Sequence, residues 1–289
     1  MSTFRLPEAT SVDSIHLRVR NLQEASRFYT TLLGFKEVMS EGNKVGFAAS
    51  GKPPAQVLLT EDYHAPQRSR SSVGLFHVAY LFPNRRELAK AFRRLYDAGY
   101  PFQGASDHGV SEALYLADPE GNGIELYADR PRDQWQVRNG ELHMYTAPLD
   151  IDHLMRELEG ATQDSDELQP DVHIGHIHLQ VSSLASAERF YHRILGFDVT
   201  TRSYPGALFV AAGGYHHHLG LNIWNSRGAP KATKGALGLT EFGVHIPDAL
   251  VLSEIERRLV ESGLPVEWTE NGKVLKTEDF DGMSIMLHL

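Results

Sequence analysis

The chain has 289 residues, a formal net charge of −9 at pH 7 and no cysteine. An acidic surface repels phosphate backbones, so nucleic acid is excluded as an expected partner. Without thiols, disulfides, thiolate catalysis and cysteine-bound metals are excluded as well, and any metal must be held by His, Asp or Glu. The first residues do not form a secretory signal and no apolar run approaches membrane-spanning length, so we expect a cytoplasmic protein with no membrane contact.

The chain repeats itself at a nearly constant offset. Residues 15–19 (IHLRV) recur at 177–181 (IHLQV), an offset of 162 (177 − 15). The DPEG run at 118–121 recurs as DFDG at 279–282, an offset of 161 (279 − 118). Such offsets indicate internal duplication and divide the sequence into four repeat units. Approximately, these units span residues 12–62, 73–128, 174–224 and 236–289.

Each repeat unit is predicted to form a strand, a helix and then further strands. In the first unit, apolar residues alternate with polar ones over 15–19, which is the period of a half-buried strand. Apolar residues at helical spacing follow over 22–33, and Gly34 supplies the helix stop. The second unit repeats this order with a helix over 86–95 that ends before Gly99. Short strands bounded by Gly, Pro and Asn-Gly complete the units, so the fold class is α+β.

The predicted domains are a first half at 1–133, a connection at 134–171 and a second half at 172–289. The connection contains a short amphipathic stretch, Ile151 to Leu158, and an acidic run, Ala161 to Asp171. We interpret it as a surface linker.

Strand alternation predicts which side chains face away from the helices. Equivalent positions on the first strands of the four units carry Ser14, His77, His176 and Glu241, and the last strands of the second and fourth units carry Glu125 and Met286. A lone His or Glu on a strand is more often structural or solvated than a ligand. Two imidazoles and one carboxylate together, however, form a ligand set that suits non-haem Fe(II).

Several motifs resemble the vicinal oxygen chelate superfamily, which includes glyoxalase I, fosfomycin-resistance proteins and extradiol ring-cleaving dioxygenases. They are the FYxxxLGF pattern at 28–35 and the DPEGNGIEL segment at 118–126. Segments 74–83, 110–116, 127–131 and 214–222 look more closely like the two-domain catechol 2,3-dioxygenases. The resemblance implies four βαβββ units that form two curved-sheet barrels.

The distribution of ligands predicts how the units pair. Pairing within each half would leave both metal sites incomplete, whereas pairing unit 2 with unit 3 unites His77, Glu125 and His176. We therefore predict pairing of 2 with 3 and of 1 with 4, which leaves the second site without metal. A rival set in the fourth and first units could hold a second metal: Glu241, His245, His288 and His16.

The resemblance implies an enzyme of aromatic hydrocarbon catabolism that cleaves catechol or a substituted catechol with O₂, using Fe(II) or, as a substitute, Mn(II). It also implies roles for three further residues. His217 is the expected acid–base catalyst, although His216 and His218 remain alternatives, as does a surface histidine run. Strand alternation would place His217 on the face opposite its two neighbours. Tyr115 is expected to hydrogen-bond the substrate hydroxyl or Glu125, and His108 to contact O₂ or the substrate. A packed strand tyrosine and a plain loop histidine are the alternatives.

Two other functions compete with the dioxygenase. One is a glyoxalase-like metal-dependent lyase or isomerase, a class that usually adds a fourth ligand, and the sequence offers no obvious candidate. The other is a non-catalytic small-molecule-binding protein of the same fold. Proteins built from paired units often form homo-oligomers, but the sequence identifies no interface.

Overall fold

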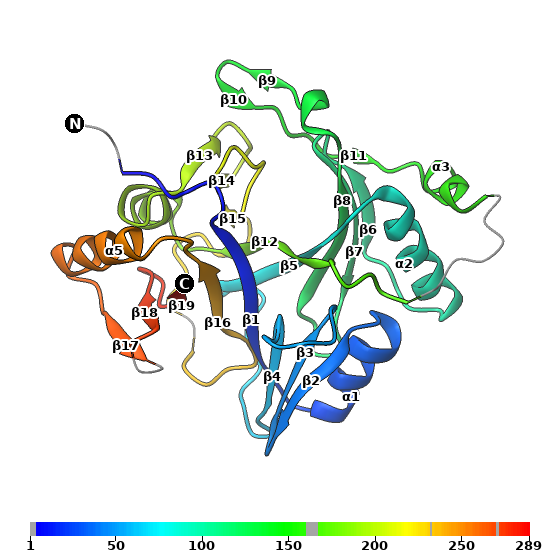
Figure 1. Ribbon diagram of the computed structural model, residues 1–289, viewed down its shortest axis with the longest axis horizontal. Helices are drawn as coiled ribbons and strands as arrows, with labels where there is room; N and C mark the ends of the chain where they lie inside the picture. Colours follow the sequence, from blue (N-terminus) through cyan, green and yellow to red (C-terminus); the bar gives the residue numbers. More distant parts are fainter. Residues whose placement is uncertain (1–3, 160–166, 232, 270–271) are drawn as a thin grey trace. The chain divides into compact units, whose positions relative to one another are not determined.

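The computed structural model describes residues 4–159, 167–231, 233–269 and 272–289 (Figure 1). Most of the acidic run expected at Ala161 to Asp171 lies outside the described residues. The chain forms two compact bodies. The first comprises the residues up to Arg18 together with Ala65–Phe76 and Gly175–Leu289, and the second comprises Val19–His64 and His77–Ile174.

All four repeat units form a strand, a helix and three strands, as the sequence predicted. The first unit consists of β1 (Ser11–Val19), α1 (Leu22–Arg27), the π-helix η1 (Phe28–Leu32), β2 (Lys36–Glu41), β3 (Lys44–Ala48) and β4 (Val57–Glu61). The second consists of β5 (Gly74–Phe82), α2 (Arg85–Asp97), β6 (Gly104–Asp107), β7 (Ser111–Ala117) and β8 (Gly123–Asp129).

The third and fourth units repeat this order. The third consists of β12 (His173–Gln180), α4 (Leu184–Ala187), the π-helix η4 (Glu188–Ile194), β13 (Asp198–Thr201), β14 (Ala207–Ala211) and β15 (Leu219–Asn222). The fourth consists of β16 (Gly238–His245), α5 (Ala249–Glu261), β17 (Glu267–Thr269), β18 (Val274–Glu278) and β19 (Ser284–His288).

Local sequence signals explain where the helices begin and end. The side chain of Asn21 accepts a hydrogen bond from the backbone of Glu24 at the start of α1, and Asn84 caps α2 in the same way. Gly34 (φ +89°) lies just past the first helix and Gly99 (φ +66°) just past the second, a conformation that L side chains rarely adopt. The helix predicted over 22–33 has the expected extent, but its second half winds as a π-helix.

The strand order confirms the predicted pairing of the units. One sheet has the order β17-β18-β19-β16-β1-β4-β3-β2 and so joins units 4 and 1. The other has the order β11-β6-β7-β8-β5-β12-β15-β14-β13 and joins units 2 and 3. Units far apart in sequence therefore share a sheet, and Ile15 of β1, for example, pairs antiparallel with Phe242 of β16.

The segment expected as a linker carries regular structure of its own. It contains the 3₁₀ turn η2 (Arg132–Gln134), a hairpin of β9 (Val137–Arg138) and β10 (Glu141–Leu142), and β11 (Ala147–Pro148). Strand β11 pairs antiparallel with β6 and extends the sheet. The amphipathic stretch 151–158 folds as α3 (Ile151–Met155) and the 3₁₀ turn η3 (Arg156–Leu158).

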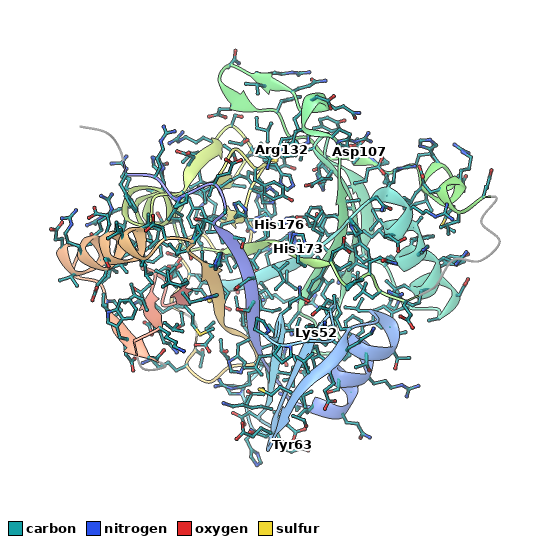
Figure 2. The ribbon with its side chains drawn as sticks, viewed as in Figure 1. Lys52, Tyr63, Asp107, Arg132, His173 and His176 are labelled. Atoms are coloured by element: carbon teal, nitrogen blue, oxygen red, sulfur yellow. The ribbon has the colours of Figure 1, made fainter. Side chains whose placement is uncertain are left out.

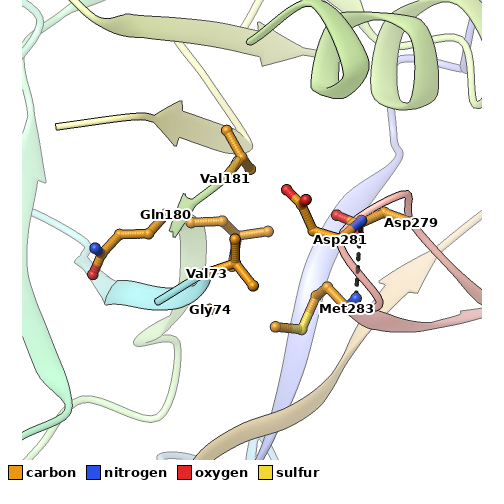
Figure 3. Close-up of a pocket in the computed structure, with 8 residues that line it drawn as sticks. Val73, Gly74, Gln180, Val181, Asp279, Asp281 and Met283 are labelled. Carbon is orange, nitrogen blue, oxygen red and sulfur yellow. Dashed lines mark hydrogen bonds between the residues drawn. The ribbon is translucent and has the colours of Figure 1, made fainter. Parts of the chain in front are cut away.

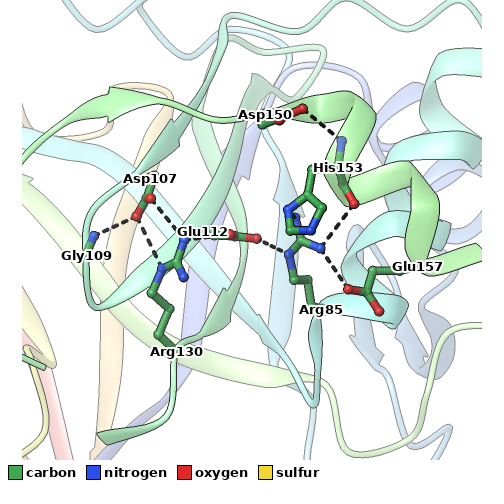
Figure 4. A network of polar contacts seen from close by, with 8 residues as sticks. All are labelled: Arg85, Asp107, Gly109, Glu112, Arg130, Asp150, His153 and Glu157. Atoms are coloured by element: carbon green, nitrogen blue, oxygen red, sulfur yellow. Dashed lines mark hydrogen bonds and ion pairs between the residues drawn. The ribbon is translucent and has the colours of Figure 1, made fainter. Parts of the chain in front are cut away.

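A connected row of ion pairs, called the ladder below, joins the second unit to the connecting segment through η3 (Figure 4). Arg130 contacts Asp107 Oδ2 at 2.9 Å and Glu112 Oε1 at 2.7 Å. The other oxygen of Glu112 accepts from Arg85 Nε at 2.5 Å, and Arg85 also reaches Glu157 of η3 at 2.7 Å. Glu112 is buried, so both of its oxygens receive the partners that a buried carboxylate requires.

The core lies on the helix-facing side of the strands. Ile15, Leu17 and Val19 of β1 are buried, as are their counterparts Ile177 and Leu179 of β12. This matches the alternation seen in the sequence and leaves the other face of the strands for polar side chains. Among the helices that the structure describes, none combines the length and apolar character needed to span a membrane.

Candidate metal centre

His77 and Glu125 come from neighbouring parallel strands. Strand β5 pairs with β8 so that His77 lies opposite Gly123 and Ala79 opposite Glu125. The two polar side chains thus project from the same face, two residues apart along the strands. His77 Nε2 lies 2.9 Å from Glu125 Oε2, and both side chains are at least nine-tenths buried. An imidazole and a carboxylate held this close in a buried place require either a shared proton or a cation.

His176 lies among other imidazoles. It is a fully buried residue of β12, which Figure 2 labels. Its ring centroid is 4.1 Å from that of His217 and 5.9 Å from that of His216. Strand β15 pairs in parallel with β12 from Ile177 and Leu219 onward, so the residues just before Leu219 lie beside His176.

The predicted ligands offer a donor set that fits a divalent cation. His77, Glu125 and His176 each supply one ligand atom, and these atoms lie within 4.8 Å of one another. Two neutral imidazoles and one carboxylate match the ligand preferences of non-haem Fe(II) and leave room for further ligands in an octahedral arrangement.

The prediction that strand alternation separates His217 from its two neighbours was wrong. His216, His217 and His218 precede β15 and are not part of a strand, so strand alternation does not apply to them. They are also not a surface run, because all three are buried. The rings of His216 and His217 both approach His176, and their Nδ1 atoms share one hydrogen bond of 2.7 Å. His218 instead accepts a hydrogen bond from the backbone of Ala212.

Tyr115 and His108 lie together beside His77 and Glu125. Strand β7 places Tyr115 directly opposite Glu125, and its ring centroid is 5.7 Å from that of His77. Tyr115 Oη lies 2.7 Å from His108 Nε2. Tyr115 also packs against the buried side chains of Ala79, Ala113 and Tyr127, which limits the rotation of its ring.

The equivalent place in units 1 and 4 carries an ion pair. Glu241, the counterpart of His77, accepts from His16 Nδ1 at 3.1 Å and from Lys276 Nζ at 2.7 Å. Lys276 itself occupies the strand position of Tyr115, at the repeat offset of 161 (276 − 115). The His16 hydrogen bond and the Lys276 ammonium lower the pKa of the Glu241 carboxyl to about 2. The repeat offset reveals the position of Lys276, but it does not predict the ion pair that Lys276 forms with Glu241.

The rival metal set is divided between different partners. Glu241 is engaged by His16 and Lys276, whereas His288 Nε2 contacts Asp13 at 3.0 Å. The rings of His245 and His288 lie 5.9 Å apart. Among the residues that the structure describes, these side chains do not meet the spacing that groups His77 with Glu125 and His176.

Two hollows elsewhere are poorly suited to an aromatic substrate. The first, of about 10 Å³, holds little more than one water molecule. Figure 3 shows its lining, which includes Val73, Gln180, Asp281 and Met283. The second, of about 200 Å³, is open and polar. It is lined by Asp107, Gly109, Arg130, Gln134, Gln136, His143 and Tyr145.

The sequence matches the model of the Glyoxalase/Bleomycin resistance protein/Dioxygenase superfamily over residues 11–126 and 173–267. It is 42% identical over 267 residues to the catechol-2,3-dioxygenase of Bacillus subtilis (strain 168), covering 91% of this chain and 92% of that protein. It is 29% identical over 130 residues to biphenyl-2,3-diol 1,2-dioxygenase 3 of Rhodococcus globerulus, covering 43% of this chain and 68% of that protein.

Solved structures share the fold at low sequence identity. A structure from Bacillus subtilis subsp. subtilis str. 168 matches with a TM-score of 0.68 and 14% identity, covering 99% of this chain and 86% of that one. Glyoxalase I from Zea mays matches with a TM-score of 0.60 and 15% identity, covering 97% and 92%. At such identities the likeness concerns the arrangement of the units and not the chemistry.

Proposed function

Because the chain belongs to the Glyoxalase/Bleomycin resistance protein/Dioxygenase superfamily, we propose that it is an extradiol dioxygenase that opens the ring of catechol or a substituted catechol with O₂. The grouping of His77, Glu125 and His176 carries the proposal, in a chain that is 42% identical to a catechol-2,3-dioxygenase over nearly its whole length. Fe(II) is the proposed metal, with Mn(II) as a substitute.

The three ligands have distinct parts in this proposal. His77 and His176 would bind the metal as neutral imidazoles, and Glu125 would add one negative charge. Bound Fe(II) would supply a Lewis acid and an electron conduit between the diol and O₂. Burial of all three side chains strengthens their electrostatic interaction with a cation and restricts competition from water.

His217 is the proposed acid–base catalyst. An imidazole can both accept and return a proton near neutral pH, as opening a catechol ring requires. Its ring is nearer to the ring of His176 than that of His216 is, which supports the choice within the run. The hydrogen bond between the two Nδ1 atoms makes one imidazole the donor and the other the acceptor, so the tautomers of His216 and His217 are coupled.

Tyr115 is the proposed substrate contact, and His108 is the proposed residue that orients it. The position of Tyr115 opposite Glu125 in the strand register supports a hydrogen bond to a substrate hydroxyl beside the ligands. His108, hydrogen-bonded to the Tyr115 hydroxyl, would hold that group in place. The substrate is therefore expected to be a vicinal diol on an aromatic ring, with a hydroxyl directed at Tyr115.

Iron binding and ring cleavage provide the test. The protein is loaded anaerobically with Fe(II), its bound iron is measured, and catechol is then added in air. We expect a yellow ring-cleavage product from the wild type, and loss of both iron and product from His77→Ala and Glu125→Gln. The matched control is Glu241→Gln, which changes the counterpart of His77 in the other sheet. Full iron content and activity in both ligand variants would refute the ligand assignment, and turnover of a thiol adduct without ring cleavage would favour the lyase.

A further inference from the structure

The segment after η2 forms an arm, residues 135–146, that reaches the turn carrying His108. Its hairpin turns at Asn139 (φ +53°) and Gly140 (φ +80°), the Asn-Gly pair typical of a tight two-residue turn. The chain then returns through Tyr145 to β11, where Ala147 pairs with Asp107 of β6. Tyr145 is thereby placed next to the loop between β6 and β7, which contains His108.

Backbone contacts hold the arm and this loop together. The Tyr145 carbonyl lies 2.8 Å from His108 Nδ1, and the Tyr145 N–H donates to the His108 carbonyl at 3.4 Å. Gly109 makes the approach possible, because a Cβ at this position would lie 2.5 Å from the Tyr145 ring. Its φ of +77° also favours glycine.

The partner of Nδ1 determines the chemistry of Nε2. His108 Nδ1 lies 2.8 Å from the Tyr145 carbonyl and 3.4 Å from the Thr146 hydroxyl. A backbone carbonyl can only accept a hydrogen bond, so the shorter contact places a hydrogen on His108 Nδ1. In a neutral imidazole the other nitrogen is then an acceptor. The 2.7 Å contact with Tyr115 must therefore be a hydrogen bond donated by the Tyr115 hydroxyl to His108 Nε2.

We propose that the arm is a positioning device for the dioxygenase reaction, with Tyr145 acting through its main chain. The Tyr145 carbonyl fixes the Nδ1–H tautomer of His108, and His108 in turn fixes the hydroxyl hydrogen of Tyr115. The Tyr115 oxygen then presents its lone pairs to the substrate and accepts a hydrogen bond from a catechol hydroxyl. This inference rests on the proposed function, because Tyr115 is assigned to the substrate there.

The first test reads the tautomer directly and needs no activity. Long-range ¹H–¹⁵N correlation spectra of the full chain labelled with ¹⁵N-histidine distinguish protonated from unprotonated ring nitrogens, and His108→Gln identifies the signals of His108. We expect the Nδ1–H form near neutral pH. An Nε2–H form would overturn the inference even if the protein is a dioxygenase. If the wild type cleaves no catechol, the function fails while the tautomer can still be observed.

The second test displaces the arm. Gly109→Ala should push the Tyr145 ring away and lower kcat/KM for catechol about tenfold, the scale at which groups that orient a site act. The loss should appear mainly in kcat, with a mixture of His108 tautomers. The matched control is Gly99→Ala, where φ is also positive but a Cβ meets nothing within 4 Å, and kcat/KM should stay within about twofold of wild type.

A second variant, Tyr145→Gly, tests the same point if Gly109→Ala does not fold. Tyr145→Gly removes the ring and frees the backbone without adding volume, so it should mix the tautomers and lower kcat in the same way. If either folded variant has changed tautomers but unchanged kcat, the arm has no positioning role. If the tautomer survives in both variants, the Tyr145 carbonyl does not set it.

Discussion

Tyr191 and Tyr29 occupy equivalent positions in two repeat units, 162 residues apart (191 − 29), but differ in one hydrogen bond. Both side chains are fully buried. Tyr191 donates to Asp279 Oδ2 at 2.8 Å, whereas the Tyr29 hydroxyl donates to no carboxylate among the described residues. Replacing each tyrosine with phenylalanine removes the same atom from the same kind of site, and the two variants isolate the value of the carboxylate contact.

The protonation state of Asp279 sets the expected magnitude. Burial raises the pKa of this carboxyl from 3.8 to about 6. At about 1.4 kcal/mol per pH unit, the difference of about 2.2 units corresponds to about 3 kcal/mol. The pKa of Asp279 is higher in the folded state than in the unfolded state. Protonation of Asp279 therefore contributes about 3 kcal/mol to the free energy of unfolding, and this contribution is fully present below the unfolded pKa. It is lost as pH rises through about 6.

Removing the Tyr191 hydroxyl takes away the hydrogen bond to Oδ2 of the ionised carboxylate, while Oδ1 keeps those from the backbone of Asp281 and Met283. Tyr191→Phe should therefore lower the free energy of unfolding by about 2–3 kcal/mol near pH 8, and by about 1 kcal/mol near pH 5, where the carboxyl is protonated. Tyr29→Phe, which removes a buried hydroxyl that has no carboxylate partner among the described residues, should change it by less than about 1 kcal/mol at either pH. Reversible urea unfolding followed by circular dichroism measures both, and equal losses in the two variants, or a Tyr191→Phe loss that is larger at pH 5, would refute the reasoning.

Three further predictions concern other buried groups. Burial also raises the pKa of Asp118 to about 6. Asp118→Asn should therefore reduce the decline in unfolding free energy between about pH 4 and 6 by about 3 kcal/mol. Urea unfolding at several pH values across this range measures the decline, and an unchanged decline would contradict the prediction. Glu112→Leu should lower the free energy of unfolding by about 3 kcal/mol, because Arg85 and Arg130 lose their shared partner. A loss below about 1 kcal/mol in urea unfolding would show that the ladder of ion pairs is dispensable. Gly220→Ala brings a Cβ to 2.8 Å from the imidazole of His178, so it should lower the free energy of unfolding by about 1–3 kcal/mol. Thermal unfolding measures the change, and an unchanged midpoint would show that the imidazole can move aside.

Much of the fold was predictable because duplication and ligand distribution constrain each other. The repeat offsets divided the chain into four units, and the resemblance to the vicinal oxygen chelate superfamily implied their βαβββ order. The distribution of His77, Glu125 and His176 over two units then predicted that those units share a sheet. The strand order agrees with this pairing. Periodicity located the strands and helices because one face of each is buried.

Features that depend on irregular backbone were not predictable in this way. The faces of His216, His217 and His218 were inferred from strand alternation, which has no meaning in the loop they occupy. The hairpin in the connection was missed although Asn139-Gly140 is a turn signal, because its strands are only two residues long and lack a periodic pattern. Lys276 was missed because its significance lies in a contact through space with Glu241.

The ion pair of Lys276 with Glu241 has a consequence for how this protein is maintained in a cell. On the proposed function, the sheet of units 2 and 3 depends on a divalent metal that must be acquired and retained. At the equivalent place, the sheet of units 1 and 4 holds the ammonium group of Lys276, which is synthesised with the chain. Withdrawal of that metal would therefore leave the sheet of units 1 and 4 with its internal cation, whereas His77, Glu125 and His176 would lose the charge that balances their carboxylate.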